Sequence, residues 1–121
     1  MRPVRVLVAD DDRDALIVLT ALLGLEGYEA RGVHNGGQVI TMARHFRPDA
    51  ILLDITMPLL NGYEVAQTLR ERYGESCPML VAVTAYSRDA DRRRAEVAGF
   101  DHYFPKPYDT KALLELLATL R

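Results

Sequence analysis

The stretch Ala50-Ile51-Leu52-Leu53-Asp54-Ile55-Thr56-Met57-Pro58 indicates both how the chain folds and where its chemistry lies. Four apolar residues run without alternation into an aspartate, and a proline four positions later stops regular structure. Such an unbroken apolar run is typical of a strand that is buried on both faces of a parallel sheet. Open α/β sheets bind ligands at the carboxyl ends of their strands, where Asp54 would lie. A lone aspartate there is more often a turn residue, so the residues at the other strand ends must decide whether Asp54 is a turn residue or a functional one.

Apolar runs followed by helical patterns recur along the whole chain. Strands are expected at residues 4–9, 28–31, 50–54, 79–83 and around 103–104. Apolar residues at helical spacing, such as Leu16, Leu19 and Leu23, mark the helix faces that pack on the sheet. Helices are expected between Asp14 and Gly27, between Asn35 and Pro48, from Asn61 to Gly74, over residues 88–98 and from near Asp109.

Five strand–helix units with short connections predict an α/β protein. Because crossovers between parallel strands are right-handed, the expected fold is a doubly wound (βα)5 sandwich of three layers, of the flavodoxin-like type. The usual strand order for this size is 2-1-3-4-5. The 121 residues are expected to form one domain over residues 1–121. In the fourth helix only Ala90, Ala95, Val97 and Ala98 form an apolar stripe, so this helix should be held weakly.

The composition narrows the classes of function. A net charge of −2 gives no reason to expect binding to nucleic acid. The single cysteine, Cys77, excludes an internal disulfide and suits a reducing compartment. The residues before the first strand show neither a signal-peptide pattern nor a membrane span, so the cytoplasm is expected and no membrane partner is.

Polar residues follow four of the expected strands. Asp10 and Asp11 follow the first strand, Asp54 ends the third, Thr84 follows the fourth and Lys106 follows the fifth. Each alone has an ordinary explanation, such as a helix cap or a solvated charge. The carboxyl ends of parallel strands share one edge, so together these residues predict one polar crevice.

Three carboxylates in one crevice repel one another and need a cation. Ligation by oxygen atoms alone selects Mg²⁺, with Mn²⁺ as a substitute. A lysine and a hydroxyl group nearby match the charge and oxygens of a phosphoryl group. The simplest chemistry is attack of Asp54 as nucleophile on a phosphoryl donor.

Taken together, these motifs resemble the receiver domain of two-component response regulators over essentially the whole chain. The matching residues are Val8-Ala9-Asp10-Asp11-Asp12, Leu53-Asp54-Ile55-Thr56-Met57-Pro58 with Asn61-Gly62, Val83-Thr84-Ala85, and Lys106-Pro107. Around Ala98-Gly99-Phe100-Asp101-His102 the chain also resembles receiver domains of hybrid histidine kinases.

The resemblance implies a role for each site residue. Asp54 would accept the phosphoryl group of a phosphohistidine, and Thr84 and Lys106 would each contact a phosphoryl oxygen. Tyr103 matches the aromatic switch position of the family. The implied Mg²⁺ ligands are Asp11, Asp54 and the carbonyl of Thr56, with Asp10 acting through water.

The resemblance also implies partners and an output. The phosphoryl donor would be a histidine kinase or a histidine phosphotransfer domain. The output face would be the fourth helix, fifth strand and fifth helix, which could also join two copies as a homodimer. The domain would catalyse only its own phosphotransfer and dephosphorylation, so it would be a signalling switch of a phosphorelay and not an enzyme in the ordinary sense.

Two further expectations concern the loops of the site. Thr56 and Tyr86 stand two residues after Asp54 and Thr84, where the resemblance places groups that set the rate of dephosphorylation. Thr56 is short and Tyr86 is large enough to shield the phosphoryl group, so a long-lived phosphorylated state is expected. The Lys106–Pro107 peptide bond is expected to be cis, because the lysine must point back into the crevice.

Three other classes of protein remain as alternatives. A phosphatase of the haloacid dehalogenase type also uses an aspartate nucleophile, but carries it after the first strand in an Asp-x-Asp motif. A flavodoxin-type flavin mononucleotide carrier needs a phosphate loop after that strand, where this chain is acidic. A degenerate receiver would bind partners without phosphorylation, and the complete site argues against it.

Overall fold

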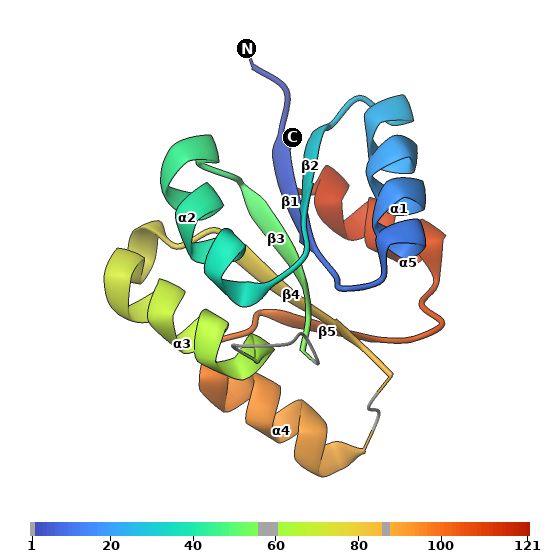
Figure 1. Cartoon of the computed structure of the whole chain (residues 1–121). Helices are drawn as coiled ribbons and strands as arrows, with labels where there is room; N and C mark the ends of the chain where they lie inside the picture. Colours follow the sequence, from blue (N-terminus) through green and yellow to red (C-terminus); the bar gives the residue numbers. More distant parts are fainter. Residues whose placement is uncertain (1, 56–60, 86–87) are drawn as a thin grey trace.

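The computed structural model describes residues 2–55, 61–85 and 88–121. Within these ranges, strands and helices alternate along the chain (Figure 1). The strands are β1 (Arg5–Ala9), β2 (Glu29–Val33), β3 (Ala50–Asp54), β4 (Met79–Thr84) and β5 (His102–Pro105). The helices are α1 (Arg13–Leu25), α2 (Gly36–Phe46), α3 (Gly62–Tyr73), α4 (Asp89–Ala98) and α5 (Thr110–Ala118), with a short 3₁₀ turn, η1 (Gly74–Ser76), after α3.

The strands form one parallel sheet in the order β2-β1-β3-β4-β5. β3 lies in the centre, between β1 and β4, and every residue from Ala50 to Asp54 is buried. An apolar run without alternation is therefore what its position requires, because both faces of this strand are covered. The predicted fold class and strand order are confirmed.

Helices cover both faces of the sheet, which separates the core into two parts (Figure 1). On one face, Leu7, Ile51 and Leu53 pack with residues of α2, α3 and α4. On the other face, Val8 and Leu52 pack with residues of α1 and α5. Neighbouring residues of one strand alternate between the two cores, as the pleat of a strand demands.

Short polar side chains fix where most helices begin. Asp12, Asn35, Asn61 and Asp109 are the N-caps of α1, α2, α3 and α5, and each accepts hydrogen bonds from backbone N–H groups of the first turn. Such caps satisfy donors that have no partner within the helix.

Helix α4 differs from the others in how it is held. Its N-cap residue, Arg88, makes no side-chain capping bond, and only Ala95 and Ala98 are buried. Val97, which the sequence placed in the apolar stripe, is 86 % exposed, and Ala90 is exposed as well, so that part of the prediction is wrong. The buried positions follow a spacing of three, and Val97 falls on the opposite side of the helix.

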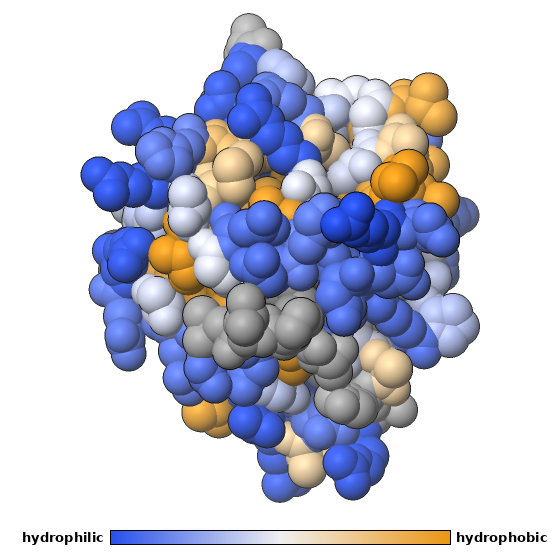
Figure 2. Space-filling model, in the orientation of Figure 1, coloured by the Kyte–Doolittle hydropathy of each residue, from blue (hydrophilic) through white to orange (hydrophobic). Residues whose placement is uncertain are grey.

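The surface in view in Figure 2 is mostly hydrophilic, but hydrophobic residues gather over α1. Ile17, Val18 and Leu25 of this helix are 64 %, 67 % and 86 % exposed. Within the described ranges, no helix combines the length and the hydropathy that a membrane crossing requires.

Candidate functional site

Residues at the carboxyl ends of four strands meet at one edge of the sheet. Asp10 directly follows β1, Asp54 is the last residue of β3 and pairs in register with Val83, and Thr84 ends β4. Lys106 follows β5, and its backbone N–H donates to the carbonyl of Thr84 at 2.7 Å. The sheet thus brings together residues that are separated by as many as 96 positions in sequence.

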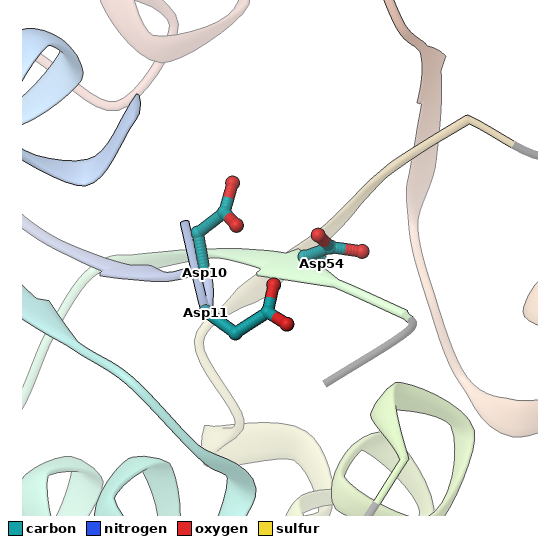
Figure 3. Close-up of side chains that lie close together, drawn as sticks. All are labelled: Asp10, Asp11 and Asp54. Atoms are coloured by element: carbon teal, nitrogen blue, oxygen red, sulfur yellow. The ribbon is translucent and has the colours of Figure 1, made fainter. Parts of the chain in front are cut away.

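Three carboxylates form the acidic part of the site (Figure 3). One oxygen each of Asp10, Asp11 and Asp54 lies within 4.8 Å of the other two. Asp10 and Asp54 are buried, whereas Asp11 is exposed, so the group is open to solvent on one side. Oxygen donors in this number and spacing fit a hard divalent cation such as Mg²⁺, which keeps several water ligands.

The ammonium group of Lys106 bridges the two buried carboxylates. Its Nζ lies 3.1 Å from Oδ2 of Asp10 and 3.3 Å from Oδ2 of Asp54. The Lys106–Pro107 peptide bond that follows is cis, as the sequence predicted.

The pKa values of Asp10 and Lys106 are both raised, for different reasons. Burial raises the pKa of Asp10, although hydrogen bonds from the Asp12 backbone and from Lys106 oppose the shift. Burial alone would lower the pKa of Lys106, but its bond to Asp10 and the charge of Asp54 outweigh this and raise it. The lysine is therefore cationic, while its charge only partly offsets the cost of burying the carboxylate of Asp10.

Thr84 is fully buried at the end of β4, the strand that pairs with β3 and places Val83 opposite Asp54. Tyr103, in the next strand, is partly buried, and burial raises the pKa of its hydroxyl group. The guanidinium of Arg92 in α4 lies over the ring of Tyr103, 5.0 Å from the ring centre, a distance at which a cation is attracted to the face of the ring. The predicted switch residue therefore contacts the weakly buried helix α4.

The contacts of the arginines in α4 were not visible in the sequence. Arg92-Arg93-Arg94 reads as a solvated face, yet Arg92 lies over Tyr103 and Arg94 lies over Tyr63, 4.2 Å from its ring centre. Only the packing of α4 against α3 and β5 shows which aromatic ring each arginine meets. The remaining predicted site residues, Thr56 and Tyr86, lie outside the described residues.

The family model described as response regulator receiver domain matches residues 6–118. The chain is 42 % identical over 118 residues to the response regulator MprA of Mycobacterium bovis, an alignment that covers 98 % of this chain and 49 % of that protein. The chain therefore spans about half the length of the curated relatives it matches.

Two solved structures combine a similar fold with detectable sequence identity. The receiver domain of a response regulator from Bermanella marisrubri is 30 % identical, with a TM-score of 0.85 and 98 % of each chain covered. The receiver domain of a sensor histidine kinase from Pseudomonas aeruginosa PAO1 is 29 % identical, with a TM-score of 0.86 and 97 % and 96 % of the two chains covered. That second structure holds a magnesium ion in its active-site cleft.

Proposed function

The chain belongs to the response regulator receiver domain family of two-component signalling, and from this premise we propose that it is a phosphorylation-dependent switch whose phosphoryl acceptor is Asp54. Residues 1–121 are proposed to form the receiver domain as a whole. The main support for the proposal is that Lys106 bridges Asp54 and Asp10 at the carboxyl ends of the strands. A third carboxylate, that of Asp11, lies beside them. A cation held by the carboxylates and a fixed positive charge would both stabilise the charge that develops when Asp54 attacks a phosphoryl group.

In the proposed reaction, a carboxylate oxygen of Asp54 attacks the phosphorus atom of a phosphohistidine. The new O–P bond forms as the P–N bond breaks, and the electron pair of that bond stays on the imidazole nitrogen. Asp54 then carries an acyl phosphate. Lys106 already lies at hydrogen-bonding distance from an oxygen of Asp54, so its ammonium is in position to pair with the added phosphoryl oxygens.

The metal in this proposal is Mg²⁺, with Mn²⁺ as a substitute. Asp11 and Asp54 would bind it directly, Asp10 through water, and the carbonyl of Thr56, which lies outside the described residues, would complete the protein ligands. When bound, the ion neutralises charge on the carboxylates and on the incoming phosphoryl oxygens. The magnesium ion in the cleft of the 29 % identical neighbour supports this assignment.

The switch is proposed to act through Thr84 and Tyr103. Phosphorylation adds about two negative charges and several acceptor oxygens to Asp54. Thr84, at the end of the neighbouring strand, would move toward them, and the ring of Tyr103 would rotate into the space that Thr84 leaves. Because Arg92 holds that ring from α4, this rotation would alter the face formed by α4, β5 and α5.

The proposed partner is a histidine kinase or a histidine phosphotransfer domain. The exposed apolar residues of α1 offer a surface for it, because this helix begins directly after Asp11 and Asp12. The α4, β5 and α5 face is the proposed output surface and a candidate homodimer contact. Cytoplasmic location and the absence of nucleic-acid binding belong to the same proposal.

The test is phosphorylation by acetyl phosphate in the presence of Mg²⁺, followed by intact-mass spectrometry. Wild type should gain the mass of one phosphoryl group, and Asp54→Asn should gain none. Asp109→Asn is a matched control, because Asn also caps a helix and residue 109 lies outside the acidic cluster. Equal labelling of wild type and Asp54→Asn would contradict the assignment, and sustained hydrolysis of a phosphate monoester would favour a phosphatase instead.

A further inference from the structure

A cavity of about 490 Å³ lies behind the acidic site, between α1 and α5. Its floor is formed by Val8, Leu52 and Val83, which are residues of β1, β3 and β4 on one face of the sheet. Leu19 of α1 and Thr110 of α5 belong to its walls. The cavity shares Asp10, Asp54 and Lys106 with the proposed phosphorylation site, whereas Asp11 does not line it.

The size and lining of this cavity suit a small organic molecule. Sites for such ligands commonly enclose about 300–1,000 Å³, with apolar walls and a few polar groups that set orientation. Here the apolar residues come from the sheet, from Ala15 and Leu19 of α1 and from Pro107 before α5, and the ring of Tyr108 adds an aromatic surface. The body of a ligand in this space would therefore be apolar and flat enough to fit between α1 and the segment that leads into α5.

The charged groups of the cavity determine what kind of polar group a ligand would carry. Asp10, Asp12 and Asp54 supply three carboxylates, and Lys106 supplies one ammonium group. With the carboxylates ionised, the lining has a formal excess of two negative charges. Both oxygens of Asp10 already accept hydrogen bonds, from the Asp12 backbone and from Lys106.

One carboxylate oxygen of Asp12 can accept a further hydrogen bond. Its Oδ1 accepts the N–H groups of Asp14 and Ala15, which caps α1, whereas its Oδ2 accepts no hydrogen bond from the described residues. A cationic group at this position would gain a charge-assisted hydrogen bond, and an anionic group would meet repulsion.

We propose that this cavity is a binding site for a small organic cation with an aromatic body. The body lies on Val8, Leu52 and Val83 between α1 and α5, and a primary ammonium group contacts Asp12 near Asp10. The proposal goes beyond the phosphoryl switch and does not depend on it, because its tests use the protein without metal and without phosphorylation.

Three compounds with the same indole ring and different charge provide the test. Tryptamine is a cation, tryptophol is neutral and indole-3-acetate is an anion at neutral pH. Titrated by NMR into metal-free protein, tryptamine should bind at least about tenfold more tightly than tryptophol, which corresponds to about 1.4 kcal/mol. Indole-3-acetate should bind most weakly, and amide shifts should centre on Val8, Val83 and Thr110. Equal binding of the cation and the alcohol, or shifts centred elsewhere, would overturn the proposal.

Two variants of α1 test the location. Ala15 lines the cavity, whereas Ala21 is exposed on the same helix and does not. Ala15→Leu should fill part of the cavity and weaken tryptamine binding at least about tenfold, while Ala21→Leu should leave it unchanged. Urea unfolding shows whether each variant folds. A folded Ala15→Leu protein that binds tryptamine as wild type does would contradict the proposed site.

Asp12→Asn tests the charge without removing the helix cap, since asparagine is an equally good N-cap residue. Tryptamine should bind several-fold more weakly to this variant, and the affinity for tryptophol should not change. Loss of affinity for both compounds alike would indicate a distorted cavity, and no loss for tryptamine would remove Asp12 from the site. Either result would overturn the assignment of Asp12 as the partner of the cation.

Discussion

Nζ of Lys106 lies 3.3 Å from Oδ2 of Asp54, although 52 positions separate the two residues. The same ammonium group lies 3.1 Å from Asp10, so a single lysine holds two buried carboxylates together. Without it, two like charges would remain at the end of the sheet with little access to water. Lys106 therefore has a structural role in the unphosphorylated domain in addition to its proposed role at the phosphoryl group.

Lys106→Met should destabilise the metal-free domain. The expected cost is about 1–3 kcal/mol, since the variant leaves both carboxylates without their cationic partner. Mg²⁺ should stabilise the variant more than it stabilises wild type, because the ion would supply the missing positive charge. The measurement is urea unfolding followed by circular dichroism, with and without Mg²⁺. Lys111→Met, an exposed position on α5, is the control, and equal unfolding midpoints for the two variants would contradict the prediction.

Asp11→Asn should weaken Mg²⁺ binding without affecting the fold. Asp11 is exposed, so its replacement disturbs no packing, yet its carboxylate is one of the three that lie within 4.8 Å of one another. Loss of one ligand charge should reduce affinity by at least about tenfold, or about 1.4 kcal/mol. Isothermal titration calorimetry measures this directly. Asp14→Asn, outside the cluster but also exposed near the start of α1, should titrate like wild type, and unchanged affinity in Asp11→Asn would exclude Asp11 as a ligand.

The fold and the positions of the site residues follow from sequence because both depend on local pattern. The unbroken run before Asp54 marks a central strand, and the carboxyl ends of parallel strands must share one edge. In a parallel sheet of these strands, Asp10, Thr84 and Lys106 must therefore lie near Asp54. Strand ends were less exact: β2 is Glu29–Val33 instead of residues 28–31, because Tyr28 donates its N–H to Leu23 and packs into the core.

What the sequence did not reveal depends on packing between distant elements. The direction of Val97 depends on how α4 is rotated, which a helix with so few apolar residues does not specify. The contact between Arg92 and Tyr103 cannot be predicted without knowing how far α4 lies from β5. The cavity exists because the side chains of α1 and of residues 106–110 leave space over the sheet, and the sequence alone does not show such a space.

Two helical glycines should respond in opposite ways to replacement by alanine. A Cβ atom on Gly62, the first residue of α3, would lie 2.6 Å from Cα of Ile55 and 3.2 Å from the carbonyl oxygen of Asp54. Because the nearest atom is backbone, Gly62→Ala should cost about 1–3 kcal/mol. Gly24 in α1 has nothing within 4 Å of such a Cβ, so Gly24→Ala should stabilise the domain by up to about 1 kcal/mol. Chemical denaturation measures both, and equal effects of the two substitutions would refute the close-contact argument.

Asp49 lies at the amino end of β3, away from the acidic site, and should make the free energy of unfolding depend on pH. Burial alone would raise the pKa of Asp49, but hydrogen bonds from Arg2 and from the backbone N–H of Arg5 outweigh burial and lower it. A carboxylate with a lowered pKa stabilises the fold above its unfolded pKa of about 3.9 and loses that contribution as the pH falls through the folded value. Asp49→Asn should therefore destabilise the domain at pH 7 and make little difference at about pH 2.

The comparison must be made as a difference between variants, because other carboxylates titrate over the same range. Those groups are present in wild type and in Asp49→Asn, so they cancel when the two unfolding free energies are subtracted at each pH. In an Arg2→Ala background the same difference should vary less with pH, because the guanidinium group that lowers the pKa of Asp49 is absent. A difference between wild type and Asp49→Asn that stays constant from pH 7 to pH 2 would show that the ionised carboxylate of Asp49 does not stabilise this edge of the sheet.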